Sequence, residues 1–169
     1  LQLARLATAL KDDEEFSRIE ELLFDEKEEA YVSDNAAAIQ RMHTILGTIY
    51  IERGEWTPKP GNPFTNATFQ LSSALFTASQ REKEEGIIQP LPQLHEWLAR
   101  AYRGQNEHDL ARTEELSAAR DYLDLDALSR AKASIDRAPD AGAPQSTRET
   151  ATTLAKIVEY RSKIPALQT

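Results

Sequence analysis

The chain has 169 residues, the length of one ordinary domain with appendages, and 40% of them are hydrophobic, enough for a buried core. Its formal net charge of −8 disfavours nucleic-acid binding, which depends on lysine and arginine neutralising phosphates. The absence of cysteine excludes disulfides, thiol catalysis and zinc ribbons. No apolar run of about 18 residues occurs, so we expect no membrane-spanning segment. The first ten residues lack a signal-peptide pattern, so we expect a cytoplasmic location, with a periplasmic one after signal removal as the alternative.

Negative charge is concentrated near the N-terminus. Between Lys11 and Glu29 ten carboxylates face only three basic residues, Lys11, Arg18 and Lys27. Charge runs of this kind are usually the solvated face of a helix. The alternative interpretation is a docking strip for a basic partner.

Apolar residues recur at spacings of three, four and seven along nearly the whole chain, which predicts helices. Strand-type alternation and Asn-Gly or Asp-Gly hairpin signals do not occur, so the expected fold class is all-α. Capping residues at Asp12, Asn35, Asn62 and Ser146 predict helix starts, and Gly54 and Gly86 predict helix ends. The expected helices cover residues 1–10, 12–31, 36–53, 63–85, 93–103, 107–123, 126–137 and 147–164.

Two segments rich in proline and glycine interrupt this pattern, a loop at 55–63 and a stretch APDAGAPQ at 138–145. We therefore expect a helical domain over 1–137, with acidic N-terminal helices at 1–31, a linker at 138–146 and a C-terminal helix within 147–169. The apolar side of that last helix must be buried, because a helix of this length is marginal alone. We expect an attachment element that packs either on its own domain or on another subunit.

A degenerate repeat is present in the middle of the chain. The segment from His43 to Tyr50 and the segment from His95 to Tyr102 both place a small residue between a leucine and a tyrosine. This pattern, followed by alanines in the next helix, resembles the tetratricopeptide (TPR) repeat. Its helix-packing positions would be Leu46, Gly47, Tyr50, Ala67, Leu98, Ala99, Tyr102 and Ala111. The chain departs from the family in the insertion between Tyr50 and Ala67, in the spacing of 52 residues between the two copies and in Glu115, where the family prefers an aromatic residue.

The resemblance implies antiparallel hairpins at about 36–85 and 92–125, stacked as a short TPR-like right-handed solenoid with extra terminal helices. It also implies that the concave face binds an extended peptide or a partner helix. The residues facing that groove would be Arg41, Thr44, Thr48, Ile51, Gln93, Glu96, Arg100 and Arg103.

Catalytic and cofactor signals do not occur in the sequence. The three histidines, His43, His95 and His108, lack ligand partners at helical spacing, and no Glu-x-x-His occurs, so we expect neither metal nor cofactor. No nucleophile-elbow, phosphate-loop or dinucleotide motif is present, so we expect no catalytic residues. The expected function is a non-enzymatic adaptor or assembly subunit that binds a protein or peptide, within a larger complex or as a homo-oligomer. The alternatives are a sensor or regulatory domain of a larger signalling protein, or an all-α hydrolase with a carboxylate site.

Overall fold

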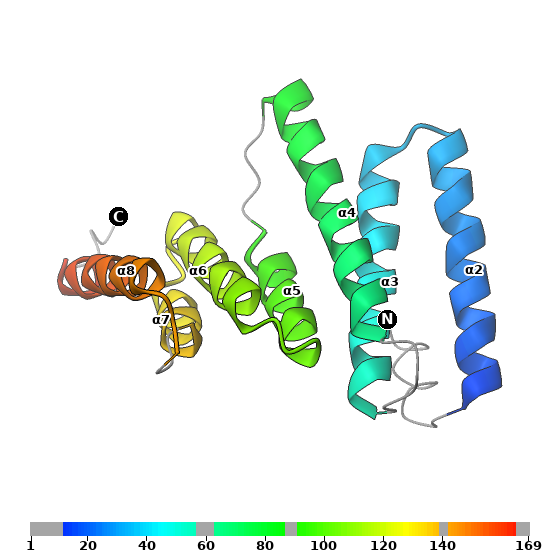
Figure 1. The fold of residues 1–169 in the computed structure, drawn as a ribbon. Helices are drawn as coiled ribbons and strands as arrows, with labels where there is room; N and C mark the ends of the chain where they lie inside the picture. The colour runs from blue at the N-terminus through cyan, green and yellow to red at the C-terminus, as the bar shows by residue number, and fades with distance from the viewer. Residues whose placement is uncertain (1–11, 57–62, 87–90, 139–141, 165–169) are drawn as a thin grey trace. The chain divides into compact units, whose positions relative to one another are not determined.

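The computed structural model describes residues 12–56, 63–86, 91–138 and 142–164, which form seven helices and no strand (Figure 1). The all-α class predicted from the sequence is therefore confirmed for this part of the chain. The predicted helix at 1–10 and the cap at Asn62 lie outside the described residues. The helices are α2 (Asp13–Val32), α3 (Ala36–Trp56), α4 (Pro63–Glu85), α5 (Pro92–Gly104), α6 (His108–Asp124), α7 (Leu128–Arg137) and α8 (Gln145–Lys163).

The chain divides into two compact units, each described separately below. Unit 1 comprises Leu1–Gln89 with Arg100–Asn106, and unit 2 comprises Pro90–Ala99 with Glu107–Thr169. Helix α5 thus contributes its first residues to unit 2 and its last ones to unit 1. This division does not coincide with the boundary predicted near residue 138, and α8 belongs to unit 2.

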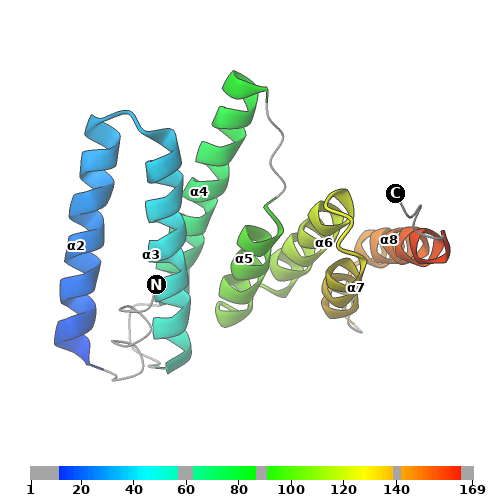
Figure 2. The same cartoon turned by 180° about the vertical axis from the view of Figure 1, so that it is seen from behind.

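In unit 1, α3 lies between α2 and α4 and packs against both (Figures 1 and 2). The two helices α3 and α4 approach closely at Gly47, where a Cβ atom would lie 2.7 Å from Leu71 Cδ2 and closer still to its Cγ. Both residues are buried, and Leu71 is fully so. Helices α3 and α4 therefore cross closely at Gly47, and only a glycine fits this contact without displacing Leu71.

Most of the local helix signals are confirmed. The Asp12 carboxylate caps α2 by accepting hydrogen bonds from the amides of Glu14 and Glu15. The Asn35 side chain accepts a hydrogen bond from the amide of Ala38 at the start of α3. Helix α4 begins at Pro63 and is followed by Gly86, whose φ of +67° is the left-handed conformation that glycine tolerates.

Two predicted helix boundaries are wrong. Gly54 does not end its helix, since α3 continues to Trp56. A Cβ at Gly54 or Gly104 would collide with the ring of Phe64, so both glycines make room for that ring near the start of α4. Ser146 does not cap the last helix either, because α8 begins at Gln145, two residues before the predicted start at 147, and has no side-chain cap.

In unit 2, α6, α7 and α8 share one apolar cluster. Helix α8 contributes the buried residues Ala151, Leu154 and Val158, and the Arg161 guanidinium donates a 2.6 Å hydrogen bond to the carbonyl of Leu123 at the end of α6. A cation at that carbonyl also interacts favourably with the helix dipole. Of the two expected placements for the C-terminal helix, the structure has the intramolecular one.

Candidate functional site

An open groove runs between α7 and α8 in unit 2, with a volume of about 490 Å³. Each helix lines it with one face, because the lining positions on each recur at spacings of three and four. The apolar part is formed by Leu128 and Ile135 from α7 and by Ala155 and Val158 from α8. The polar lining residues are Ser129, Lys132, Asp136, Glu159 and Ser162.

The rim of the α7–α8 groove carries ion pairs within each helix. Lys132 bonds Asp136 at 2.6 Å on α7, and Lys163 bonds Glu159 at 2.5 Å on α8. The hydrogen bond from Lys163 holds the pKa of the Glu159 carboxyl below its usual value. The two helices together carry seven basic and three acidic side chains, in contrast to the strongly acidic α2.

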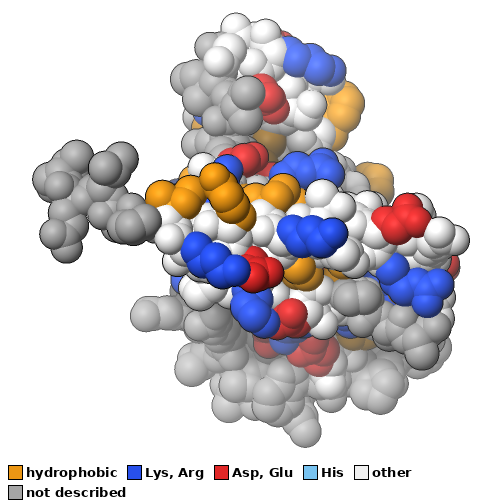
Figure 3. Space-filling model, turned by 90° about the vertical axis from the view of Figure 1, so that its left-hand side faces the viewer, with side chains coloured by type: hydrophobic (Ala, Val, Ile, Leu, Met, Phe, Trp, Pro, Cys, Tyr) orange, Lys and Arg blue, Asp and Glu red, His pale blue; other side chains and the backbone are white. Residues whose placement is uncertain are grey.

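Further hydrophobic side chains, on α8 and at Ile164 directly after it, lie exposed beyond the groove. Ile157 is 37% exposed, Ile164 51% and Tyr160 70%. Figure 3 shows the side of the molecule on which α8 lies in Figure 1, where hydrophobic side chains sit among basic and acidic ones. Apolar surface rimmed by charge is typical of a protein-binding surface.

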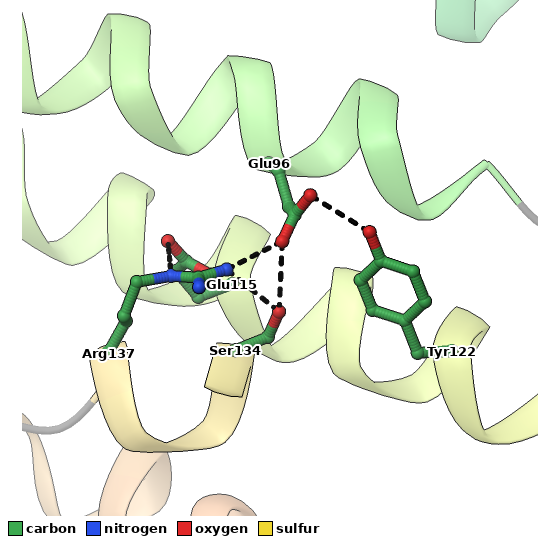
Figure 4. Close-up of polar contacts among 5 residues, drawn as sticks. All are labelled: Glu96, Glu115, Tyr122, Ser134 and Arg137. Atoms are coloured by element: carbon green, nitrogen blue, oxygen red, sulfur yellow. Dashed lines mark hydrogen bonds and ion pairs between the residues drawn. The ribbon is translucent and has the colours of Figure 1, made fainter. Parts of the chain in front are cut away.

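A polar cluster holds α7, one wall of the groove, against α5 and α6 (Figure 4). At its centre, the Arg137 guanidinium donates to Glu115 Oε1 at 3.0 Å and to Glu96 Oε1 at 2.6 Å. Glu96 also accepts a 2.9 Å hydrogen bond from the Tyr122 hydroxyl, and Arg137 donates a third bond to the hydroxyl of Ser134.

This cluster brings two carboxylates to one guanidinium. Glu115 is only 1% exposed, so its carboxylate needs a cation partner, which Arg137 supplies. The hydrogen bond to Glu115 is the main reason that the pKa of Arg137 is raised, with Glu96 adding to it against the opposing effect of burial. The arrangement can fix α7 in place. Both carboxylates accept hydrogen bonds from Arg137, so they contribute to the packing of α7.

The eight residues predicted to face a concave groove have unequal surroundings. Ile51 is 1% exposed and lies in the core of unit 1, which corrects its assignment as a ligand-facing residue. Glu96 is engaged in the cluster of Figure 4, and Arg100 pairs with Glu52 and Glu55, whose hydrogen bonds raise the pKa of Arg100. Arg41 and Gln93 are exposed, whereas Thr44, Thr48 and Arg103 are half-buried. Six of the eight belong to unit 1, and Gln93 and Glu96 belong to unit 2.

The eight predicted packing residues are mostly interior. Tyr102 is half-buried, and the other seven are buried: Leu46, Gly47, Tyr50, Ala67, Leu98, Ala99 and Ala111. Tyr50 is additionally bound through its hydroxyl to Glu20 of α2, and burial followed by that hydrogen bond raises the pKa of the phenol.

The histidines take structural positions. His43 is buried, with Nδ1 2.6 Å from Gln70 Oε1 and Nε2 2.8 Å from the Tyr31 hydroxyl. Since an amide oxygen only accepts, Nδ1 carries the proton and Nε2 accepts from Tyr31. Burial is the main reason that the pKa of His43 is lowered. His95 donates to Glu114 at 2.6 Å, and His108 is exposed at the start of α6. In the described part of the chain, no group of three or more His, Asp or Glu side chains is arranged to hold a metal ion.

Comparison with known proteins finds no matching family model, no matching curated protein and no matching solved structure. The resemblance to the tetratricopeptide repeat therefore stays a prediction from the sequence. Within the described residues, no helix is both long enough and apolar enough to cross a bilayer.

Proposed function

We propose that this protein is a non-enzymatic interaction module, an adaptor or assembly subunit, that binds an amphipathic helix with acidic flanks in the α7–α8 groove. The observation that carries the proposal is the groove itself. It is lined by apolar side chains of α7 on one side and of α8 on the other, and charged side chains lie at its rim. Amphipathic helices recognise such grooves by placing side chains at i, i+3, i+4 and i+7 into them.

The position of the groove favours a preformed site. One wall, α7, is held by Arg137 to α5 and α6, and the other wall, α8, is anchored by buried Leu154 and by Arg161. A groove with fixed walls loses little conformational entropy when a ligand enters it. Its volume of about 490 Å³ accommodates several side chains of a partner helix.

Charge decides which amphipathic helix fits best. The seven basic side chains of α7 and α8 against three acidic ones favour a ligand with carboxylates beside its apolar stripe. The groove lining itself carries Lys132 beside Asp136 and Glu159, so the basic excess that a ligand's carboxylates would meet lies on the parts of α7 and α8 around the groove. The TPR-like pattern in the sequence supports a binding function in general, and its concave-face residues are a separate prediction.

The test uses two synthetic 18-residue helical peptides of the same leucine stripe, one flanked by glutamate and one by lysine. Fluorescence anisotropy measures their affinity for the full chain, and amide chemical shifts map the binding surface. We expect the glutamate peptide to bind at least about tenfold more tightly and to perturb α7 and α8. Ala155→Trp, which fills the groove, should abolish this binding.

A matched control is Thr152→Trp, which adds the same ring to an exposed position of α8 that does not line this groove. It should leave peptide affinity unchanged. The proposal fails if neither peptide binds, if Ala155→Trp has no more effect than Thr152→Trp, or if the shifts lie outside α7 and α8.

A further inference from the structure

Helix α4 of unit 1 carries an exposed aromatic stripe. Phe69 is 66% exposed and Phe76 is 65% exposed, and their spacing of seven residues places them on one face. The exposed positions continue along that face at alternating intervals of four and three residues, as in a coiled-coil seam. They are Thr65, Phe69, Ser72, Phe76, Ser79 and Lys83, which we name the α4 stripe.

All positions of the α4 stripe except Lys83 lie in the longest uncharged part of the described chain. From Pro63 to Gln80 there is no acidic or basic residue, although 28% of the whole chain is charged. Residues 12–29 carry ten acidic and two basic side chains, and the rest of the chain carries eighteen of each. The entire net charge of −8 therefore comes from the region of α2, which packs on the other side of α3 from α4.

Three hydroxyl groups beside the α4 stripe, those of Thr68, Ser73 and Thr77, can be desolvated at low cost. Thr68 donates to the carbonyl of Thr65, Ser73 to that of Phe69 and Thr77 to that of Ser73, each at 2.9 Å. Because these donors are already satisfied within α4, covering them leaves no hydrogen bond unmade.

We infer that the α4 stripe is a self-association surface, and that its occupant is the α4 stripe of a second copy of this chain in antiparallel orientation. In this register Phe76 packs over Ser72 of the second copy, and Phe69 packs over Ser79. Each large ring then meets a small side chain, which fills the interface better than a parallel pairing of Phe on Phe and Ser on Ser. A symmetric dimer requires such self-complementarity of one patch.

The charge distribution permits a second copy as the occupant and disfavours a charged partner. Two copies of net charge −8 repel each other, and the repulsion is smallest when they meet at an uncharged face with the acidic α2 helices kept away from the contact. A charged partner, by contrast, finds no complementary group between Pro63 and Gln80.

The available area indicates a weak dimer. A fully covered phenylalanine buries about 150–250 Å², so four rings that are two-thirds exposed supply roughly 400–650 Å². A stable interface buries about 1,200–2,000 Å² in total, and the small residues around the rings add only part of the difference. We expect dimers to form at high protein concentration and to dissociate on dilution.

Sedimentation equilibrium of the full chain between about 1 µM and about 1 mM tests the association. The wild type should show a monomer–dimer equilibrium, and Phe69→Ser/Phe76→Ser should raise the dissociation constant by about tenfold or more. The matched control is Leu22→Ser, which removes a 58% exposed hydrophobic residue from α2 and should leave the equilibrium unchanged. Circular dichroism of the dilute proteins should show equal melting temperatures.

A spin label tests the orientation. The chain has no native cysteine, so Lys83→Cys gives a single labelling position at an exposed end of the α4 stripe. In the antiparallel register residue 83 lies opposite residue 65, so the two labels are separated by about 27 Å along the helix axis. A parallel pair of helices would bring them within about 20 Å.

Four results would overturn the inference: a monomer at every concentration, a dimer that the double phenylalanine variant does not weaken, a label separation typical of parallel helices, or a lower melting temperature of the dilute double variant. The last result would mean that the rings are covered within one chain. None of these results bears on peptide binding in the α7–α8 groove, which lies in unit 2.

Discussion

The close contact between Gly47 and Leu71 allows a sharp test of how unit 1 is packed. In Gly47→Ala the new methyl group would overlap the Leu71 side chain, which has no solvent-exposed surface into which it could turn. The neighbouring carbonyl of Ala67, 3.4 Å from the added carbon, limits movement toward α4 as well. The substitution adds one carbon and therefore isolates this contact.

Two opposing effects set how much Gly47→Ala changes the free energy of unfolding. Alanine stabilises a helix interior by about 1 kcal/mol relative to glycine. Overpacking a core costs about 1–3 kcal/mol. We expect Gly47→Ala to change the free energy of unfolding by between about 0 and 2 kcal/mol in the destabilising direction. The larger Gly47→Leu should be destabilising by more.

A double-mutant cycle separates the two effects. Leu71→Ala alone should cost about 2–5 kcal/mol, because it leaves a cavity. In that background the clash is gone, so Gly47→Ala should stabilise by about 1 kcal/mol and its sign should reverse. One tryptophan, Trp56, belongs to unit 1 and the other, Trp97, to unit 2, so a Trp97→Phe background lets fluorescence report denaturant unfolding of unit 1.

A Gly47→Ala variant that is more stable than the wild type by the full helix-propensity difference would contradict the clash with Leu71. So would an effect of Gly47→Ala that is the same with and without Leu71. Either result would mean that α3 and α4 do not meet at this pair of residues.

Three further substitutions probe polar contacts. Arg137→Met should destabilise unit 2 by roughly 1–3 kcal/mol in chemical denaturation, because buried Glu115 loses its cation, and adding Glu115→Gln should recover part of the loss. Burial lowers the pKa of His43 below 6.5, so the unfolded state binds more protons than the folded state. The free energy of unfolding should therefore fall as the pH drops through 6.5 toward the lowered pKa. His43→Asn should flatten that part of the pH–stability profile, whereas the control His108→Asn, at an exposed position, should not. Arg100→Ala should cost less than about 1 kcal/mol by the same measurement, because its ion pairs are partly exposed.

The helices could be predicted from the sequence because their signals are local. Apolar spacing and the caps at Asp12 and Asn35 act within a few residues of the element they specify. Gly54 was misinterpreted as a helix end because its contact, the ring of Phe64, depends on how α4 packs against α3. No local pattern contains that information.

The candidate site was harder to predict for the same reason. The apolar residues Leu128, Ile135 and Val158 were visible as helical stripes, but the groove exists only once α8 has packed beside α7. Glu115 appeared in the sequence only as a departure from an aromatic preference. The structure explains it by Arg137, 22 residues further along the chain, which lies in a helix that the repeat pattern does not include.

Removal of α8 tests whether the groove depends on intramolecular packing. A chain that ends at Pro144 loses the buried side chains of Leu154 and Val158, each worth about 1.5–3 kcal/mol, so these two side chains account for up to roughly 3–6 kcal/mol of lost stability. Trp97 fluorescence should report a lower stability of unit 2, whereas a chain ending at Ile164, which keeps all of α8, should match the wild type. The shorter chain should also lose peptide binding but keep self-association through the α4 stripe, which lies in unit 1. Unchanged stability of unit 2 would show that α8 does not pack there in solution, and the groove would then have no second wall.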